Sequence, residues 1–275
     1  MNSIKSSISD SVASPRVPKF IPAVTVLAIL ISLAFNFGFT FDNWMGASLH
    51  QQLSTGLEEM AIAPAFYALA IWGGIYLGLF MLMAYQFGFG HEFPRNHQYW
   101  HEPEFQRTNR FLIGAVLCQA LWAGLFAAHQ TLLASLAMAG VVTFLVRIYR
   151  TLGISVTRAS RRRRWLCHAP ISLYLGWATF LMVITLATGL HHAGWQVGAA
   201  DWGVIVISAL ALFSAWFIAT YRDTLFTIGV IWGLVMVALQ QQDVAQINVV
   251  SAFAAAVLLF WLVWVKNPPR QKYLY

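Results

Sequence analysis

The chain alternates between long apolar stretches and short polar connections. The eight apolar stretches are residues 20–39, 64–85, 111–128, 131–149, 165–188, 202–220, 225–239 and 247–265. A helix needs about 20 mostly apolar residues to cross the hydrocarbon core of a bilayer. None of the stretches shows the two-residue alternation of a membrane β-strand. The pattern therefore predicts an all-α polytopic membrane protein with eight transmembrane spans.

Two of the connections bear directly on this count. The third and fourth spans are separated only by His129 and Gln130, which predicts a tight antiparallel helical hairpin. The seventh stretch, residues 225–239, is the shortest of the eight. A chain with seven spans is therefore the alternative to the eight-span prediction.

Composition agrees with a membrane protein and excludes several other classes. Hydrophobic residue types make up 59% of the 275 residues, and charged types only 10%. A soluble domain carries about 25% charged residues, so an ordinary cytosolic enzyme or a disordered regulator would look different. The chain has only two cysteines, which also argues against a disulfide scaffold.

The basic residues predict the orientation of the spans. With eight spans, all 17 Lys and Arg residues fall in the two tails and in alternate connections, on one side of the membrane. Positive residues favour the cytoplasmic side, so both termini are expected there. The four arginines at 161–164 are interpreted as part of this topology signal, and no nucleic-acid partner is expected. The location predicted is a bacterial inner membrane, either cytoplasmic or photosynthetic.

The span interiors hold almost no ionisable side chains. Acidic or basic residues deep in a membrane usually mark ion pathways, proton relays or voltage sensors, and none is found here. The chain also lacks a nucleophile elbow, a P-loop, a dinucleotide-binding loop and a zinc-protease motif. His97 and His101 have a spacing that suits a metal, but they lie in a polar connection with two prolines. We therefore predict a non-enzymatic protein without a metal site.

Three spans each carry a face centred on tryptophan. These faces contain Trp72 and Tyr76 in the second span, Gln119, Trp122 and Phe126 in the third, and Tyr174 and Trp177 in the fifth. The spacings of three and four residues place each group on one side of its helix. Such faces indicate either packing between helices or a cavity for a flat apolar ligand.

Three motifs carry a resemblance to a known family. They are residues 63–76 (APAFYALAIWGGIY), 119–126 (QALWAGLF) and 170–180 (PISLYLGWATF). In this order they resemble helices two, three and five of the tryptophan-rich sensory protein/translocator protein (TspO/MBR) family, especially its longer bacterial members. The chain departs from that pattern at Gln119, where the family usually has Asn, and at Thr185, which stands in the place of an Asn late in the fifth helix.

The resemblance implies a fold, a domain organisation and a site. It implies a five-helix bundle over residues 20–188, followed by a three-helix extension over 189–265, with cytoplasmic tails at 1–19 (expected to be flexible) and 266–275. It also implies a pocket for porphyrins, sterols or other flat molecules, lined from the first, second, third and fifth helices. By match, Trp72, Tyr76, Gln119, Trp122, Phe126 and Trp177 are the pocket candidates, and the residue pattern adds Tyr174.

The leading hypothesis is a membrane binding or sensory protein that influences the transport or signalling of its ligand. The ligand expected is a tetrapyrrole (haem, porphyrin or chlorophyll), a carotenoid or a sterol-like molecule. The expected partners are membrane lipids, this hydrophobic small molecule, and a second copy of the chain or a larger membrane complex.

Two rival functions stay open. One is an accessory structural subunit of a pigment-binding membrane complex, suggested by tryptophans expected to face lipid in the last three spans: Trp216, Trp232, Trp261 and Trp264. The other is an enzyme that acts on a tetrapyrrole, which is disfavoured because the spans contain no acid–base pair.

Overall fold

The computed structural model describes residues 20–41, 62–88, 102–195 and 198–266, which form helices and turns and contain no strand. The long helices are α1 (Ile21–Phe41), α3 (Ile71–Gln86), α4 (Pro103–Ala127), α5 (Thr131–Thr151), α7 (Ala169–His192), α8 (Ala199–Tyr221), α9 (Thr224–Gln240) and α10 (Ala245–Lys266). Shorter helical segments are η1 (Phe66–Ala70), α6 (Arg161–Arg163) and the π-helical η3 (Arg164–His168). The prediction of an all-α membrane protein is confirmed.

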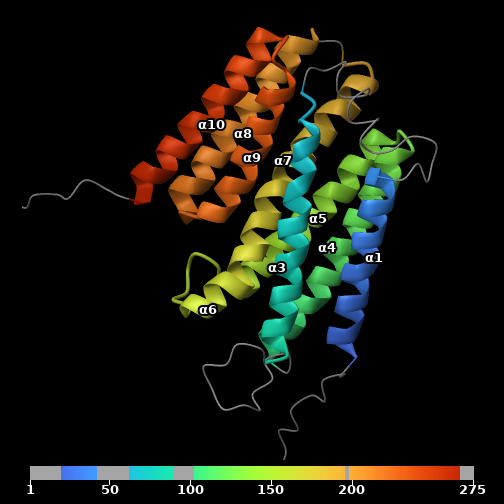
Figure 1. The fold of residues 1–275 in the computed structure, drawn as a ribbon, viewed down its shortest axis with the longest axis vertical. Helices are drawn as coiled ribbons and strands as arrows, with labels where there is room; N and C mark the ends of the chain where they lie inside the picture. The colour runs from blue at the N-terminus through green and yellow to red at the C-terminus, as the bar shows by residue number, and fades with distance from the viewer. Residues whose placement is uncertain (1–19, 42–61, 89–101, 196–197, 267–275) are drawn as a thin grey trace, which may run out of the picture.

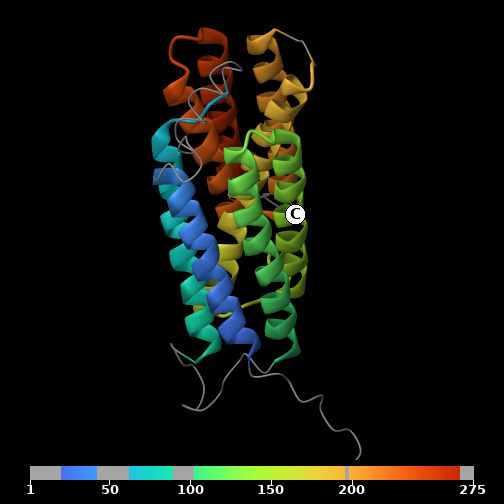
Figure 2. The ribbon, with the colours of Figure 1, turned by 90° about the vertical axis from the view of Figure 1, so that its right-hand side faces the viewer.

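The long helices run roughly side by side, and successive helices along the chain point in opposite directions (Figures 1 and 2). α7 is the central helix because it packs against α3 and α5 on one side and α9 on the other. In the most apolar part of the span that contains α7, 78% of the residues are buried, against 33% in α10. α10 therefore lies in the outer layer of the C-terminal part, with α9 between it and α7, and α8 packs mainly on α10.

All eight predicted apolar stretches are helical. In the described part of the chain, seven helical spans are long and apolar enough to cross a membrane, where η1 and α3 form one span and α6, η3 and α7 form another. α9 falls below that length with 17 residues. α9 packs between α7 and α10, so neighbouring helices, rather than lipid, cover most of its surface. This packing explains why a short apolar stretch still forms a stable helix within the bundle.

The predicted hairpin between the third and fourth spans is present. His129 turns the chain with a φ of 58°. Its backbone N–H donates to Phe126 (3.0 Å), and the N–H of Gln130 donates to Leu125 (2.9 Å). These bonds satisfy carbonyl groups at the end of α4 that the helix itself leaves unpaired.

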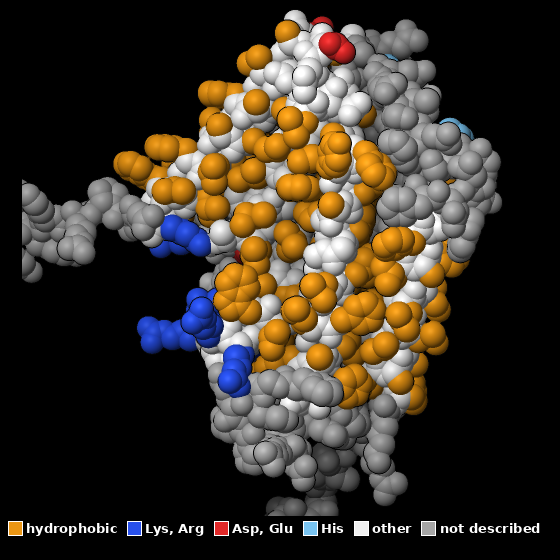
Figure 3. All heavy atoms as spheres, in the orientation of Figure 1, with side chains coloured by type: hydrophobic (Ala, Val, Ile, Leu, Met, Phe, Trp, Pro, Cys, Tyr) orange, Lys and Arg blue, Asp and Glu red, His pale blue; other side chains and the backbone are white. Residues whose placement is uncertain are grey.

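The alternating direction of the helices brings the described basic residues to one end of the bundle, called the basic end below. Arg110 lies near the start of α4, Arg150 near the end of α5, and Arg222 between α8 and α9. Figure 3 shows Lys and Arg side chains at one end of the visible face and acidic side chains at the other. The residues at 1–19 and 267–275, and the pair His97 and His101, lie outside the described part of the chain.

The contact between α7 and α9 depends on glycines in both helices. A Cβ on Gly176 would overlap the backbone carbonyl of Phe226, and one on Gly229 would lie 2.9 Å from the backbone N of Trp177. Small residues let two backbones approach closely where the hydrophobic effect does not drive helix association. Phe226 is buried there and stacks on Phe217 of α8, with 3.8 Å between ring centroids.

The first prediction concerns this contact. We expect Gly176→Ala to push α9 away from α7 and to lower the free energy of unfolding by about 3 kcal/mol, the upper range for overpacking. The measurement is thermal denaturation in mild detergent. Gly73→Ala is the matched control, because a Cβ at that position meets nothing within 4 Å. An equal loss of stability in both variants would contradict this account.

Candidate functional site: an aromatic cavity

Four of the predicted site residues form one aromatic cluster between α3 and α7. The ring of Trp72 lies 5.9 Å from Tyr76, 5.9 Å from Tyr174 and 6.2 Å from Trp177, measured between centroids. All four side chains are buried. The rings meet in tilted or edge-to-face arrangements, which are the favourable geometries for aromatic pairs.

The third-span face forms a second group between α4 and α7. The Trp122 ring lies 5.7 Å from Phe126, and its Nε1 donates a hydrogen bond of 3.2 Å to Thr185 Oγ1. Trp122 is 1% exposed, and Thr185 is equally buried. Thr185, where the family pattern has an Asn, therefore fixes the orientation of the Trp122 indole.

Several polar atoms near these rings are buried without a partner. Neither the oxygen nor the nitrogen of the Gln119 amide has a hydrogen bond, although Gln119 is 0% exposed. The indole nitrogens of Trp72 and Trp177 are likewise unpaired. A buried polar group without a partner costs about 1–3 kcal/mol, so such atoms are rare in folded proteins. Trp72 and Trp177 belong to the aromatic cluster, and Gln119 precedes Trp122 by one turn of α4.

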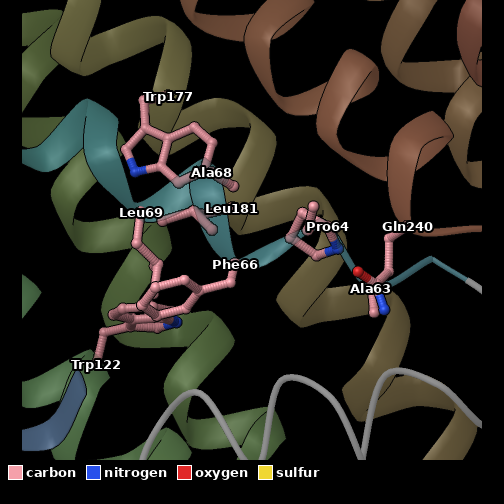
Figure 4. A pocket seen from close by; sticks show the side chains of 10 residues that line it. Ala63, Pro64, Phe66, Ala68, Leu69, Trp122, Trp177, Leu181 and Gln240 are labelled. Atoms are coloured by element: carbon pink, nitrogen blue, oxygen red, sulfur yellow. The ribbon is translucent and has the colours of Figure 1, made fainter. Parts of the chain in front are cut away.

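A small cavity of about 70 Å³ adjoins both groups. Its lining consists of Ala63, Pro64, Ala65, Phe66, Ala68, Leu69, Trp122, Trp177, Leu181 and Gln240. Figure 4 shows Trp122 and Trp177 on either side of η1, with Phe66 and Leu69 on the side of Trp122. The cavity therefore lies near the end of the bundle opposite the basic end, between η1, α4, α7 and α9.

The segment of residues 62–70, which covers the cavity, is fastened to α9 and the residue that follows it. The N–H of Ala65 donates to the Met236 carbonyl (2.9 Å), and Gln241 Nε2 donates to the Ala63 carbonyl (3.3 Å). Trp232 Nε1 donates to the Ala68 carbonyl (3.1 Å). α9 is therefore part of the site, which the sequence did not suggest.

Trp232 corrects one expectation. It was expected to face lipid with Trp216, Trp261 and Trp264, but it is only partly exposed and packs against η1 through its indole N–H. The reason is the close contact between α9 and its neighbours, which turns this face of α9 inward. The other three tryptophans are between 37% and 56% exposed, as expected of lipid-facing residues.

Only two of the seven predicted site residues line the cavity. Trp122 and Trp177 line it, whereas Trp72, Tyr76, Gln119, Phe126 and Tyr174 are not lining residues. Trp72 packs on Trp177, and Phe126 packs on Trp122. Most of the lining residues that were not predicted as site residues lie at 63–69, within the motif at 63–76.

Two residues of α1 were also missed. The Tyr76 hydroxyl lies 2.9 Å from Ser32 Oγ and accepts a hydrogen bond from Asn36 Nδ2 (2.7 Å). Ser32 and Asn36 are four residues apart in an apolar helix and therefore lie on the same face of it. This pattern is the one that could have predicted a polar contact between α1 and the site. α1 thus supports the site through Tyr76 but contributes no residue to the cavity lining.

The cavity lining offers no metal ligand. It contains no His, Cys, Met or carboxylate side chain, and the described residues contain no group of three or more His, Cys, Asp or Glu that could hold a metal ion. A haem iron or chlorophyll magnesium would therefore receive no side-chain ligand from these residues.

Taken together, the long apolar helices of the described residues define a polytopic membrane protein. The model of the family described as TSPO-like protein matches residues 22–264, so the chain belongs to that family. The match runs from α1 to α10 and therefore includes the last three helices as well as the five that carry the motifs. No curated protein and no solved structure matches the chain.

The second prediction tests the polar support of the cluster. Tyr76→Phe keeps the ring but removes the oxygen that joins Ser32 and Asn36, so two buried polar groups lose a partner. We expect the free energy of unfolding to fall by about 1–3 kcal/mol. Tyr67→Phe, at a tyrosine that is 71% exposed, is the matched control and should leave the denaturation midpoint unchanged. A Tyr76→Phe variant as stable as wild type would refute this role.

Proposed function

We propose that the protein binds a flat hydrophobic molecule in the aromatic cavity and acts in the transport or sensing of that molecule. The observation that carries this proposal is the unpaired indole nitrogen of Trp177, which lines an apolar opening. Two more buried residues with unpaired atoms belong to the same helix faces: Trp72, whose ring packs on Trp177, and Gln119, one turn before Trp122 in α4. Binding sites for small molecules combine apolar walls with a few placed polar groups in this way. The family assignment independently supports a membrane sensory or binding protein.

Binding would depend mainly on stacking and on the removal of apolar surface from lipid and water. Trp122 and Trp177 supply large flat surfaces on two sides of the cavity. The unpaired Trp177 indole N–H would donate to an acceptor on the ligand, and the Gln119 amide could both donate and accept once the site opens. A tetrapyrrole, a carotenoid or a sterol-like molecule with a polar edge has the flat apolar surface and the polar groups that this combination would bind.

The size of the cavity implies that the site opens when the ligand enters. A volume of about 70 Å³ is far below the 300–1,000 Å³ of a typical small-molecule pocket. Phe66 and Leu69 fill much of the space between η1 and Trp122, so the 62–70 segment has to move. That movement would strain or break its hydrogen bonds to α9. Occupancy of the cavity would thereby change the position of α9, which is the physical link between binding and a signal.

A binding function agrees better with the site than catalysis does. The residues that line the cavity include no side chain that exchanges a proton near neutral pH, so the lining has no general acid or base. The TSPO-like family consists generally of non-catalytic membrane binding proteins. A non-enzymatic role is therefore part of the proposal.

The rival role as an accessory subunit has no comparable support. It rests on exposed tryptophans such as Trp216 and Trp264, which are 56% and 51% exposed. Lipid chains cover such side chains in any membrane protein, so their exposure does not indicate a protein partner. Partners beyond lipid and the small molecule stay predictions.

The third prediction uses Gln119, because a binding role and a purely structural role give different results. Gln119→Leu removes two unpaired polar atoms, so the ligand-free protein should become more stable by about 1 kcal/mol or more. The same change should weaken binding of protoporphyrin by roughly five-fold, the value of one lost hydrogen bond. The measurements are thermal denaturation without ligand and quenching of tryptophan fluorescence during a protoporphyrin titration.

Trp216→Leu is the matched control for fluorescence, because it removes an exposed tryptophan far from the cavity lining. Its dissociation constant should equal that of wild type. Quenching that does not saturate, or equal affinities in wild type and Gln119→Leu, would argue against a ligand in this cavity.

A further inference from the structure

A second opening lies at the basic end, and the cavity of the proposed function does not account for it. It is a groove of about 700 Å³ between the α5–α6 connection, η3, the turn from α8 to α9, and the end of α10. Four cations line this groove: Arg158, Arg164, Arg222 and Lys266. They come from four separate parts of the chain, so the fold, rather than one run of sequence, brings them together.

Among the residues that the structure describes, no carboxylate forms an ion pair with any of these four cations. Within the described ranges, the ion pair of this region joins Arg163 to Glu104, and neither of those residues lines the groove. Arg158, Arg164, Arg222 and Lys266 are all exposed. A groove lined by four unpaired cations has a positive potential that attracts anions.

One carboxylate does line the groove, but its hydrogen-bonding capacity is already used. Asp223 Oδ2 accepts hydrogen bonds from Tyr149 (2.8 Å) and Ser172 (2.7 Å), and Oδ1 accepts from the backbone N–H groups of Leu225 and Phe226. Asp223 is 7% exposed and caps the start of α9. It therefore stabilises the turn from α8 to α9, and it leaves the cations available to an external anion.

A buried histidine adds a donor without a partner. His168 lines the groove from η3, is 6% exposed, and has no hydrogen-bond partner at Nε2. A buried ring nitrogen of this kind is seldom left unpaired. His168 also ends a π-helical turn, a distortion that is frequent at functional sites. The unpaired Nε2 points to a ligand with an acceptor oxygen.

The backbone of Arg222 gives a further indication. Arg222 has a φ of 52°, in the left-handed region, where glycine is the residue without a steric penalty. The chain places a long cationic side chain here instead, beside the groove. Strained positions of this type gather at binding sites.

The groove also carries apolar side chains that are open to the surroundings. Trp165 is 60% exposed, Val156 81% and Ile228 43%, and all three line it. Free phosphate would gain nothing from these residues, whereas a phospholipid places acyl chains beside its phosphate. The combination of cations and apolar residues therefore favours an amphiphile.

We propose that this groove binds the phosphate headgroup of an anionic phospholipid. Arg158, Arg164, Arg222 and Lys266 would surround the phosphate, and His168 Nε2 would donate to one of its oxygens. The acyl chains would lie along Trp165 and Ile228. Basic pockets between membrane helices on the cytoplasmic side are a known type of site for such headgroups.

The fourth prediction tests this site with Arg222→Gly in the full-length protein in mild detergent. Glycine tolerates the left-handed backbone, so this variant removes a cation without strain. We expect dioctanoyl phosphatidylglycerol to raise the denaturation midpoint of wild type in a saturable manner, and dioctanoyl phosphatidylcholine to raise it less. The apparent dissociation constant for phosphatidylglycerol should rise about ten-fold in Arg222→Gly, as expected for one lost charge-assisted contact.

Lys266→Gln provides a second variant at an exposed helix end and should show a similar loss. Arg110→Gln removes the same charge at the same end of the bundle, outside the groove, and should bind like wild type. Equal effects of the two lipids, or equal losses in Arg110→Gln and Arg222→Gly, would overturn the proposal. Inorganic phosphate at the same concentration should give no shift, and a shift equal to that of the lipid would show a simple anion site instead.

Discussion

The close approach of α7 and α9 is the contact on which the rest of the structure depends. Gly176 and Gly229 allow the two backbones to touch, so α9 lies in the interior although it is short for a membrane helix. With α9 in this position, Trp232 and Met236 reach the segment that covers the cavity. A larger side chain at Gly176 would separate these elements and remove one wall of the site.

Buried polar groups toward the two ends of the bundle differ in whether they have hydrogen-bond partners. At the basic end, Asp223 is buried with four donors, and such a fully satisfied network holds a turn rigidly. Near the other end, the Gln119 amide is buried without any partner. An apolar residue in place of Gln119 would cost less, so its presence is hard to explain by stability alone. The contrast is therefore between a carboxylate whose hydrogen bonds are all made and an amide that has none.

The sequence was sufficient for the helices and for part of the site. Apolar length and charge alternation predicted eight helices because both are local or additive properties of the chain. The spacing of Trp72 and Tyr76 correctly predicted one buried face. The sequence did not show that Trp232 turns inward, since that depends on glycines in two distant segments. The boundary between residues 188 and 189 stays a prediction.

The position of α9 relates the two proposed sites to one another. Its first residues follow Asp223, which lines the basic groove, and Gln240 at its last turn lines the aromatic cavity. If a ligand displaced the 62–70 segment, its hydrogen bonds to α9 would carry part of that displacement to the groove at the other end of the helix. The contact at Gly176 restricts that motion to sliding or rotation against α7, because a further approach is sterically blocked. The family match through residue 264 is consistent with α9 being part of the working unit rather than an appendage.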